Sequence, residues 1–390
     1  MSIGDELTAA SVRVTRSEYL AAVPEPGSNE YLQLAHTDHM LVAKWSAQGG
    51  WDSPCIKPYG ELGILPTASS LHYATECFEG LKAYRGEDSR LRLFRPDENG
   101  ERLQMSAKRA SLPTVQPDQL KYLIEKLLEI EGPRWLPKDQ PRQFLYIRPA
   151  IIGTGHQLSF GIPQEALFFI VAAPYPDMSK VVRSRGTSNA GLKLVASPPG
   201  YTRSWPGGVG YAKLGANYNP SLEAHSAAKA SGFDQVLWTF GESQLVTEAG
   251  ASNFFVIWRN KQTQALELVT ATLEGDLILG GITRKSVLEV AKTRFSRRVG
   301  KFSSLTVIER EFSITEIEGA WKEDRLIEAF VSGTAYFITA VSLIRTATCD
   351  IEFPLLGEDK RYSAAIRGWI ESITYGIESH EWSHIISDKA

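Results

Sequence analysis

Lys213 lies in the stretch GGVGYAKLGANYNPS, residues 207 to 221, among glycines and small residues. Because the neighbouring glycines have no side chain, the backbone there can approach a ligand closely. Desolvation in such a place disfavours the charged ammonium, and a neutral lysine amine can attack a carbonyl carbon. The run fits neither GxxxxGK[ST] nor GxGxxG, the two common phosphate-binding glycine motifs. Taken alone, it fits a surface loop with an incidental lysine as well.

Three further segments offer groups that would complement such a lysine. TEAGASNFF places Glu248 at the end of a strand, where its carboxylate could pair with a cationic ring nitrogen. LGGITRKS puts glycines before a helix with Thr283 at or near its N-cap, and the N–H groups and dipole of a helix start attract phosphate. FVSGTAYF ends a strand in a turn at Gly333, Thr334 and Ala335, whose N–H groups could hold a second anion. Each segment alone also fits an ordinary turn or helix start, but together they supply the groups that pyridoxal phosphate requires.

The elements that must position these groups follow from hydrophobic periodicity. Runs of apolar, β-branched and aromatic residues predict strands, and apolar residues at helical spacing predict helices. A helix from Pro117 to Ile130 has a clear apolar face, and Gly132-Pro133 is expected to end it. The predicted strands are 91–94, 143–152, 166–174, 234–240, 252–258, 265–272, 304–311 and 328–333, and later helices are predicted at about 283–295 and 361–375.

The polar stretch 177–191 predicts a linker between two domains. It is short of large apolar residues, as interdomain linkers are. We therefore expect an N-terminal domain over residues 1–182 and a C-terminal domain over residues 183–390. Strands and helices mix in both halves, which predicts two α/β or α+β domains with a cleft between them.

Composition and charge narrow the class of protein. The 42 basic and 45 acidic residues give a net charge of −3, so we expect no broad attraction to nucleic acid or to an anionic membrane. Cys55, Cys77 and Cys349 are far apart and form no CxxC motif, so we expect reduced thiols rather than a disulfide or a zinc site. We expect the cytoplasm, with the mitochondrial matrix less favoured, because the N-terminal residues include acids and lack an apolar core.

Longer segments point to a known family. In the first half of the chain they are TDHMLVAKW, SSLHYATECFEGLKAYRG, LRLFRPDENGERLQMSAKR and LYIRPAIIGT. In the second half they are GGVGYAKLGANYNPSLEAH, VLWTFGESQLVTEAGASNFFVIW, LEGDLILGGITRKSVLE and VSGTA. These segments resemble the branched-chain-amino-acid aminotransferase family, class IV pyridoxal phosphate enzymes of fold type IV. The resemblance runs in order from about Thr37 to Gly376.

The resemblance implies a fold and an activity. It implies a smaller N-terminal α/β domain and a larger C-terminal domain, with pyridoxal 5'-phosphate in the cleft between them. It implies transamination of leucine, isoleucine and valine with 2-oxoglutarate, by a ping-pong route that yields branched 2-oxo acids and L-glutamate. A homodimer is also implied, because in this family the loop that matches GTGHQLSFGI (153–162) reaches the partner's pocket.

The resemblance also implies a role for each matched residue. Lys213 would bind the cofactor covalently and move a proton, Glu248 would bond its ring nitrogen, and Tyr218 would contact its phenolic oxygen. The other implied cofactor-binding residues are Arg102, Gly281, Ile282, Thr283 and Thr334, and the arginine and the helix start would hold the phosphate. The implied substrate-binding residues are Tyr73, Phe78, Tyr146, Arg148, Gln235, Ala251, Thr334 and Ala335.

Two alternatives stay open at this point. Ala251, Ser252 and His36 depart from the family pattern, so the side-chain specificity could be altered to serve a specialised pathway. HEWSH (380–384) fits the HExxH motif of zinc proteases, which would make the protein a zinc hydrolase. Only six residues follow this motif, which leaves no room downstream for the usual third ligand, so we expect a polar tail and no metal.

Overall fold

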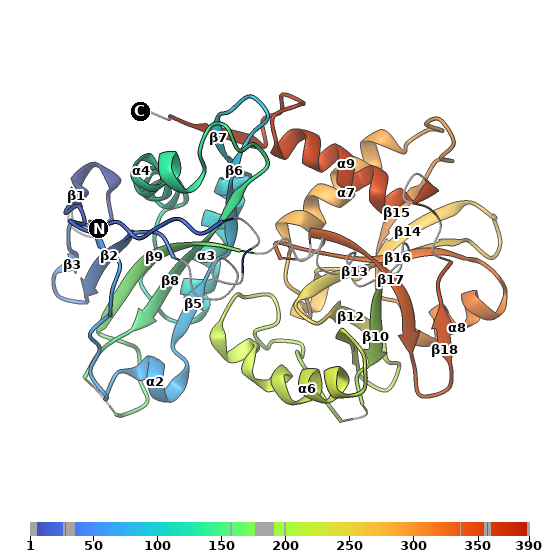
Figure 1. The fold of residues 1–390 in the computed structure, drawn as a ribbon. Coiled ribbons are helices and arrows are strands. Elements are labelled where there is room, and N and C mark those ends of the chain that lie inside the picture. Colours follow the sequence, from blue (N-terminus) through green and yellow to red (C-terminus); the bar gives the residue numbers. More distant parts are fainter. Residues whose placement is uncertain are drawn as a thin grey trace. The chain divides into compact units, whose positions relative to one another are not determined.

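The computed structural model describes residues 6–25, 28, 36–156, 158–175, 191–198, 200–335, 337–354, 357 and 360–387. The chain forms two compact units, whose elements are labelled in Figure 1. Unit 1 comprises Met1–Pro176, Ala212–Ala216 and Ser372–Ala390, and unit 2 comprises Asp177–Tyr211 and Asn217–Glu371. The short segment with Lys213 therefore belongs to unit 1. The predicted domain boundary after residue 182 stays a prediction, and the predicted linker 177–191 lies outside the described residues except for Gly191.

A ten-stranded sheet forms the centre of unit 1. Its order is β1-β4-β2-β9-β8-β6-β7-β19, with β3 paired to β2 and β5 paired to β8. The central strands β8 and β9 bury most of their side chains, which explains their continuous apolar sequences. The strands are β1 (Arg13–Val14), β2 (His39–Ser46), β3 (Gly50–Trp51), β4 (Cys55–Pro58), β5 (Glu76–Phe78), β6 (Leu81–Arg85), β7 (Leu91–Phe94), β8 (Phe144–Gly153), β9 (Glu165–Pro174) and β19 (Ser383–Ile386).

The helices of unit 1 are η1 (Ala9–Ser11), α2 (Ser69–Tyr73), α3 (Pro96–Arg109) and α4 (Pro117–Trp135). The predicted end of α4 at Gly132-Pro133 is wrong, because Pro133 lies inside the helix. Proline removes one helical hydrogen bond, but Arg134 and Trp135 in the last turn both bind the Asp38 carboxylate. These tertiary contacts hold the last turn in helical form.

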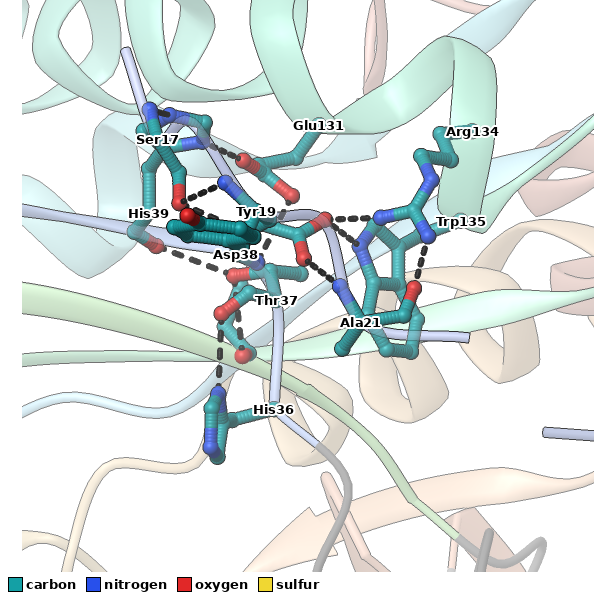
Figure 2. A network of polar contacts seen from close by, with 11 residues as sticks. Ser17, Tyr19, Ala21, His36, Thr37, Asp38, His39, Glu131, Arg134 and Trp135 are labelled. Atoms are coloured by element: carbon teal, nitrogen blue, oxygen red, sulfur yellow. Dashed lines mark hydrogen bonds and ion pairs between the residues drawn. The ribbon is translucent and has the colours of Figure 1, made fainter. Parts of the chain in front are cut away.

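Figure 2 shows how this end of α4 also binds the N-terminal segment of the chain. His39 Nε2 accepts a hydrogen bond from the Ser17 N–H at 2.8 Å, and Nδ1 contacts the buried Glu131 carboxylate. Because Nε2 is the acceptor, the ring proton of a neutral His39 lies on Nδ1, facing Glu131. Asp38 accepts a hydrogen bond from the Ala21 N–H at 2.8 Å.

The HEWSH segment is not the polar tail that we expected. Strand β19 pairs antiparallel with β7, and Ile386 is buried. The Arg95 guanidinium carbon lies 4.4 Å from the centre of the Trp382 ring, and His384 Nε2 lies 2.6 Å from Glu125 Oε1. The expectation is wrong because the end of this segment pairs with β7 as the last strand of the sheet of unit 1.

A nine-stranded mixed sheet forms the centre of unit 2. Its order is β12-β11-β10-β17-β16-β13-β14-β15, with β18 paired to β17 and an additional pairing of β12 with β13. Phe254, Val256, Phe312 and Val331 belong to one buried apolar cluster on this sheet. The strands are β10 (Leu192–Ala196), β11 (Gln235–Phe240), β12 (Leu245–Ala249), β13 (Ser252–Arg259), β14 (Leu266–Thr270), β15 (Thr306–Glu309), β16 (Leu326–Gly333), β17 (Phe337–Arg345) and β18 (Asp350–Glu352).

The helices of unit 2 begin at well-defined residues. Ser313 and Glu316 form a capping box at the start of α8. At the start of α9 the buried Glu328 accepts the N–H groups of Tyr362 and Ser363 at 2.9 and 3.2 Å. The helices are η2 (Gly215–Asn217), where the chain passes from unit 1 to unit 2, η3 (Asn219–Ser221), α6 (Leu222–Ala230), η4 (Glu274–Asp276), α7 (Ile282–Arg294), α8 (Ile314–Lys322) and α9 (Tyr362–Thr374), whose last residues belong to unit 1.

The predicted strands are confirmed, and the predicted ends differ from the observed ends by at most two residues. The predicted helices at 283–295 and 361–375 are confirmed as α7 and α9. Among the described residues, every helix is too short or too polar to cross a membrane.

Candidate functional site

The backbone of Lys213 is fixed between β5 and α3. Its N–H donates to Ser106 Oγ at 2.9 Å, and its carbonyl oxygen accepts the Phe78 N–H at 3.1 Å. The next residue, Leu214, forms a β-bridge with Cys77. The Lys213 side chain is half-buried, and Nζ lies 4.8 Å from the centre of the Phe78 ring. The structure therefore gives Lys213 a defined position rather than that of an incidental lysine in a surface loop.

The glycines near Lys213 make room mainly for the protein itself. A Cβ at Gly215 would lie 1.8 Å from Glu76 Oε1, and a Cβ at Gly210 would lie 2.6 Å from the Asp276 carbonyl oxygen. At these two positions protein atoms occupy the space that a side chain would need, and the expectation that these glycines admit a ligand stays a prediction.

Two cations lie close to the ring of Phe78. The Arg148 guanidinium carbon is 4.7 Å from the centre of the Phe78 ring, close to the distance of the Lys213 amine on the same ring. Arg148 also donates to Tyr146 Oη at 3.0 Å. Gly80 permits this arrangement, because a Cβ there would lie 2.0 Å from Tyr146 Oη. Unit 1 thus brings together four of the predicted site residues, and cation–π attraction favours their arrangement.

Arg102, on α3, is held by the carboxylate of Glu79. Arg102 Nε donates to Glu79 Oε1 at 2.6 Å, and Nη2 donates to Oε2 at 2.9 Å. Asn99 Nδ2 and the Gly80 N–H also donate to Oε2, at 2.7 and 3.1 Å. Complete burial raises the pKa of Glu79, but Arg102 and Lys213 outweigh this effect and hold the pKa below its ordinary value of 4.5. Glu79 is therefore an ionised carboxylate in a buried place.

Tyr73 is the last residue of α2 and contacts a loop. Its hydroxyl donates to the Leu158 carbonyl oxygen at 2.5 Å, and its ring lies edge-on to Phe160 with centres 5.7 Å apart. Tyr73 thus belongs with the exposed loop of unit 1 that contains Leu158 and Phe160.

In unit 2, Glu248 forms an ion pair with Arg203. The distance between Arg203 Nη1 and Glu248 Oε2 is 2.5 Å, and both side chains are buried. Glu248 Oε1 accepts the Leu279 N–H at 3.2 Å and lies 3.4 Å from Asn253 Nδ2. Asn253 stands opposite Glu248 in the β12–β13 pairing, so the hairpin itself brings the amide to the carboxylate.

The start of α7 follows directly on this cluster. Gly281 is its N-cap, and a Cβ there would lie 2.1 Å from Asn253 Oδ1. In the part of the chain that the structure describes, no side chain makes a capping hydrogen bond to this helix start. Ile282 and Thr283 are the first two residues of the helix, so their N–H groups suit an anion.

The remaining predicted residues of unit 2 lie at turns and strand ends. Gln235 begins β11, and Gly250, at φ +58°, is a required glycine because a Cβ would lie 2.0 Å from Gln235 Oε1. Ala251 is exposed in the following turn. The others are half-buried, with Tyr218 directly before η3 and Thr334 and Ala335 in the turn after β16.

Comparison with known proteins places this arrangement in a family. The family described as amino-transferase class IV matches residues 76–344, well over half of the chain. The chain belongs to the class IV aminotransferases. This aminotransferase is 39% identical to the cytosolic branched-chain-amino-acid aminotransferase of Saccharomyces cerevisiae, over 98% of both chains. It is 39% identical to the branched-chain-amino-acid aminotransferase of Monosiga brevicollis, over 91% of this chain and 87% of that one.

Solved structures agree with the fold of this aminotransferase. The branched-chain aminotransferase of Thermoproteus uzoniensis with norvaline matches with a TM-score of 0.66 and 24% identity, covering 88% of this chain and 99% of that chain. The pyridoxal phosphate form of the Thermobaculum terrenum enzyme matches with a TM-score of 0.68 and 20% identity, covering 91% and 100%. The predicted family and fold type IV are confirmed.

Class IV aminotransferases depend on pyridoxal phosphate, so the predicted cofactor is confirmed. The residues present fit it, because the structure shows a lysine amine, an arginine on a fixed carboxylate, a buried glutamate and an uncapped helix start. The individual role of each residue stays a prediction. The zinc hydrolase alternative is not favoured: among the described residues, no group of three or more His, Cys, Asp or Glu side chains could hold a metal ion.

Sequence reasoning missed the residues that hold the charged groups in this aminotransferase. Glu79 binds Arg102, and Asn99 donates to Glu79. Arg203 and Asn253 contact Glu248. Glu79 had one available signal, because it is an acid inside the apolar run between Cys77 and Leu81. Arg203 lies in a polar loop sequence that gives no comparable signal.

Proposed function

We propose that this aminotransferase transfers the amino group of leucine, isoleucine or valine to 2-oxoglutarate, yielding branched 2-oxo acids and L-glutamate by a ping-pong route. The names of relatives that are 37–39% identical over nearly the whole chain support this substrate class. The observation that carries the proposal is the Lys213 amine, whose backbone is fixed on both sides while Nζ lies over Phe78.

In unit 1, we assign the covalent attachment and the proton transfer to Lys213. Bound pyridoxal phosphate supplies a carbonyl carbon and a ring that accepts electrons from the substrate. With the cofactor bound, the Lys213 amine would serve as the general base and acid for the proton on the substrate's α-carbon. Arg102 is the phosphate ligand of this unit. Its substrate contacts are Tyr73, Phe78, Tyr146 and Arg148.

In unit 2, we assign to Glu248 the contact with the ring nitrogen, because a buried carboxylate keeps a neighbouring ring nitrogen protonated. Tyr218 contacts the phenolic oxygen. The start of α7, with Gly281, Ile282 and the backbone and hydroxyl of Thr283, supplies further phosphate ligands, and Thr334 is a further cofactor contact. Gln235, Ala251, Thr334 and Ala335 are the substrate contacts of this unit.

The visible absorption spectrum of the purified full-length protein tests this function. We expect a yellow band that bleaches when leucine is added and returns with 2-oxoglutarate. Lys213→Ala should abolish the band, whereas Lys44→Ala, which changes an exposed lysine of unit 1, should leave it intact. A protein that stays colourless with added cofactor would refute the proposal.

A transaminase with a different amino donor is the second candidate, because Ala251, which departs from the family pattern, is exposed in its turn. Rates with leucine, isoleucine and valine should exceed those with aromatic or longer aliphatic amino acids. Indifference to all three branched-chain donors would favour the second candidate.

We also propose that the protein is a homodimer. Unit 1 exposes apolar side chains next to Tyr73: Leu158 is 60% exposed, Phe160 87% and Ile162 65%. Exposed apolar clusters of this kind mark interaction sites. The family resemblance implies that this loop reaches the pocket of the partner subunit. Sedimentation should give twice the mass of the chain, and Phe160→Ser with Leu158→Ser should weaken the dimer. A wild-type monomer would contradict the proposal.

For its compartment we propose the cytoplasm. Two relatives from Saccharomyces cerevisiae, cytosolic and mitochondrial, are 39% and 38% identical to this chain, so similarity alone does not separate the two compartments. The proposal depends on the acidic residues near the N-terminus and on the isolated cysteines. Cell fractionation tests it, and recovery with the mitochondrial matrix would contradict it.

A further inference from the structure

Glu79 accepts four hydrogen bonds from its neighbours in unit 1. An ionised carboxylate offers about four acceptor sites, and Glu79 receives two hydrogen bonds from Arg102, one from Asn99 and one from the Gly80 N–H. The Glu79 side chain is also fully buried. Three of these bonds are on Oε2 and one is on Oε1, and the donors enclose the carboxylate, so we expect its effect on a ligand to pass through the residues it holds.

Arg102 is the residue through which that effect passes. Its Nε and Nη2 are both directed to Glu79 in a bidentate pair, and its side chain is 10% exposed. A planar guanidinium that is held along one edge has its orientation fixed, and its donors on the other edge are pre-oriented. Asn99 stands one helical turn before Arg102 on α3 and bonds the same carboxylate, so the helix and the carboxylate are tied together.

We propose that Glu79 is a positioning residue, which orients Arg102 for the phosphate of the cofactor. This inference extends the proposed function, because it takes from it the role of Arg102. Phosphate recognition by arginine depends on fixed donor geometry as well as on charge. Loss of Glu79 should therefore weaken the binding of the phosphate group and leave the binding of the remainder of the cofactor unchanged.

The test compares two ligands that differ only in the phosphate. Full-length protein freed of cofactor is titrated with pyridoxal 5'-phosphate and with pyridoxal, followed by visible absorption. Glu79→Gln should weaken pyridoxal 5'-phosphate binding by about tenfold or more, the loss expected for a hydrogen bond to a charged group. Pyridoxal binding should stay within about twofold, given that it lacks the group that Arg102 holds.

Two variants separate positioning from general damage. Glu131→Gln changes another buried carboxylate of unit 1, one that contacts His39, and should leave both affinities unchanged. In an Arg102→Met background, Glu79→Gln should have no further effect on pyridoxal 5'-phosphate binding. If Glu79→Gln does not fold, Asn99→Ala removes one donor from Glu79 and should show the same selective loss in milder form.

Equal weakening of both ligands, or no weakening of either, would overturn the proposal. If the wild-type protein binds pyridoxal but gains no affinity from the phosphate, the proposal also fails. If the wild-type protein binds neither ligand covalently, the proposed function itself fails, and with it the role of Arg102 from which the inference starts.

Discussion

Unit 1 and unit 2 each bury a glutamate against an arginine and an asparagine, and the two groups differ in which charge is enclosed. In unit 1, Glu79 is fully enclosed while the Arg102 side chain is 10% exposed. In unit 2, the Arg203 and Glu248 side chains are 4% and 2% exposed, so both members are enclosed. In unit 1 a buried carboxylate, Glu79, therefore holds a partly exposed cation, Arg102. In unit 2 the carboxylate of Glu248 and its countercharge, Arg203, are both buried.

The hydrogen bonds differ in the same sense. The Asn99 amide nitrogen lies 2.7 Å from the Glu79 carboxylate, whereas that of Asn253 lies 3.4 Å from Glu248. Glu79 is held by four hydrogen bonds of 2.6 to 3.1 Å, whereas Glu248 has two hydrogen bonds of 3.2 and 3.4 Å besides its ion pair with Arg203. The same three residue types thus serve opposite purposes in our proposal, because the cofactor carries an anionic phosphate and a cationic ring nitrogen.

The largest effect should follow from Glu248→Gln. It removes the proposed partner of the ring nitrogen while it keeps the size of the side chain, so kcat/KM with leucine should fall by about 100-fold or more, as when a preorganised electrostatic contact is lost. Glu328→Gln is the matched control, because Glu328 is a buried carboxylate of unit 2 that caps α9. A comparable loss of kcat/KM in the control would show that any buried charge change in this unit has this effect.

The next effect concerns stability and compares the two arginines. Arg203→Met leaves Glu248 buried without its countercharge, which should cost about 3–5 kcal/mol of unfolding free energy. Arg102→Met should cost less, because Glu79 keeps the nearby charge of Lys213 and hydrogen bonds of 2.7 and 3.1 Å, whereas the bonds that Glu248 keeps are 3.2 and 3.4 Å long. Urea unfolding of the two variants, with Arg203→Lys as the charge-conserving control, measures the difference. If both variants lose the same unfolding free energy, the complete burial of Arg203 and Glu248 does not make their ion pair more important for stability than that of Arg102 and Glu79.

Much of the fold and part of the site could be predicted from the sequence. The apolar strands β8, β9 and β13 bury most of their side chains, so their sequences clearly indicate strands. Lys213, Glu248 and Thr283 could be proposed because local sequence indicates a permissive loop, a strand end and a helix start. These are properties of neighbouring residues in the chain.

The supporting residues could not be predicted, because they are defined by contacts between distant segments. Glu79 and Arg102 are 23 positions apart, and Glu248 and Leu279 are 31 positions apart. The last turn of α4 and strand β19 were missed for the same reason: Asp38 holds the former and β7 the latter. Local propensity cannot register a partner that folding brings from elsewhere.

A smaller effect should distinguish the two asparagines. Asn99→Ala removes a hydrogen bond of 2.7 Å to a charged group, which should cost about 1.5–3 kcal/mol of unfolding free energy. Asn253→Ala removes only a 3.4 Å contact with Glu248, but it also removes a bond of 2.8 Å to the Leu279 carbonyl oxygen. That second bond is between neutral groups, so its loss should cost only about 1 kcal/mol. Thermal or urea unfolding measures both, and a larger cost for Asn253→Ala would reverse the comparison.

The smallest expected effect is on the pH dependence of stability, and it differs in sign between two buried carboxylates. Arg102 and Lys213 hold the pKa of Glu79 below 4.5, so its contribution is present above pH 4.5 and is lost as the pH falls through the lowered pKa. Burial raises the pKa of Glu328 above 4.5, and its hydrogen bonds from Ser363 and Tyr362 reduce this effect without cancelling it. Its contribution is therefore fully present below pH 4.5 and is lost as the pH rises through the raised pKa.

Replacing each carboxylate by glutamine should change the pH profile of the unfolding free energy in opposite directions. Relative to the wild type, Glu79→Gln should become less stable as the pH rises towards 4.5, since the variant lacks the charge that Arg102 stabilises. Glu328→Gln should instead gain relative to the wild type as the pH rises above 4.5, since the variant has no proton to lose. Urea midpoints measured from pH 3 to 8 decide between these slopes. If both variants change in the same direction, the two pKa shifts do not have opposite signs, and Arg102 and Lys213 do not outweigh burial at Glu79 while Arg361 fails to do so at Glu328.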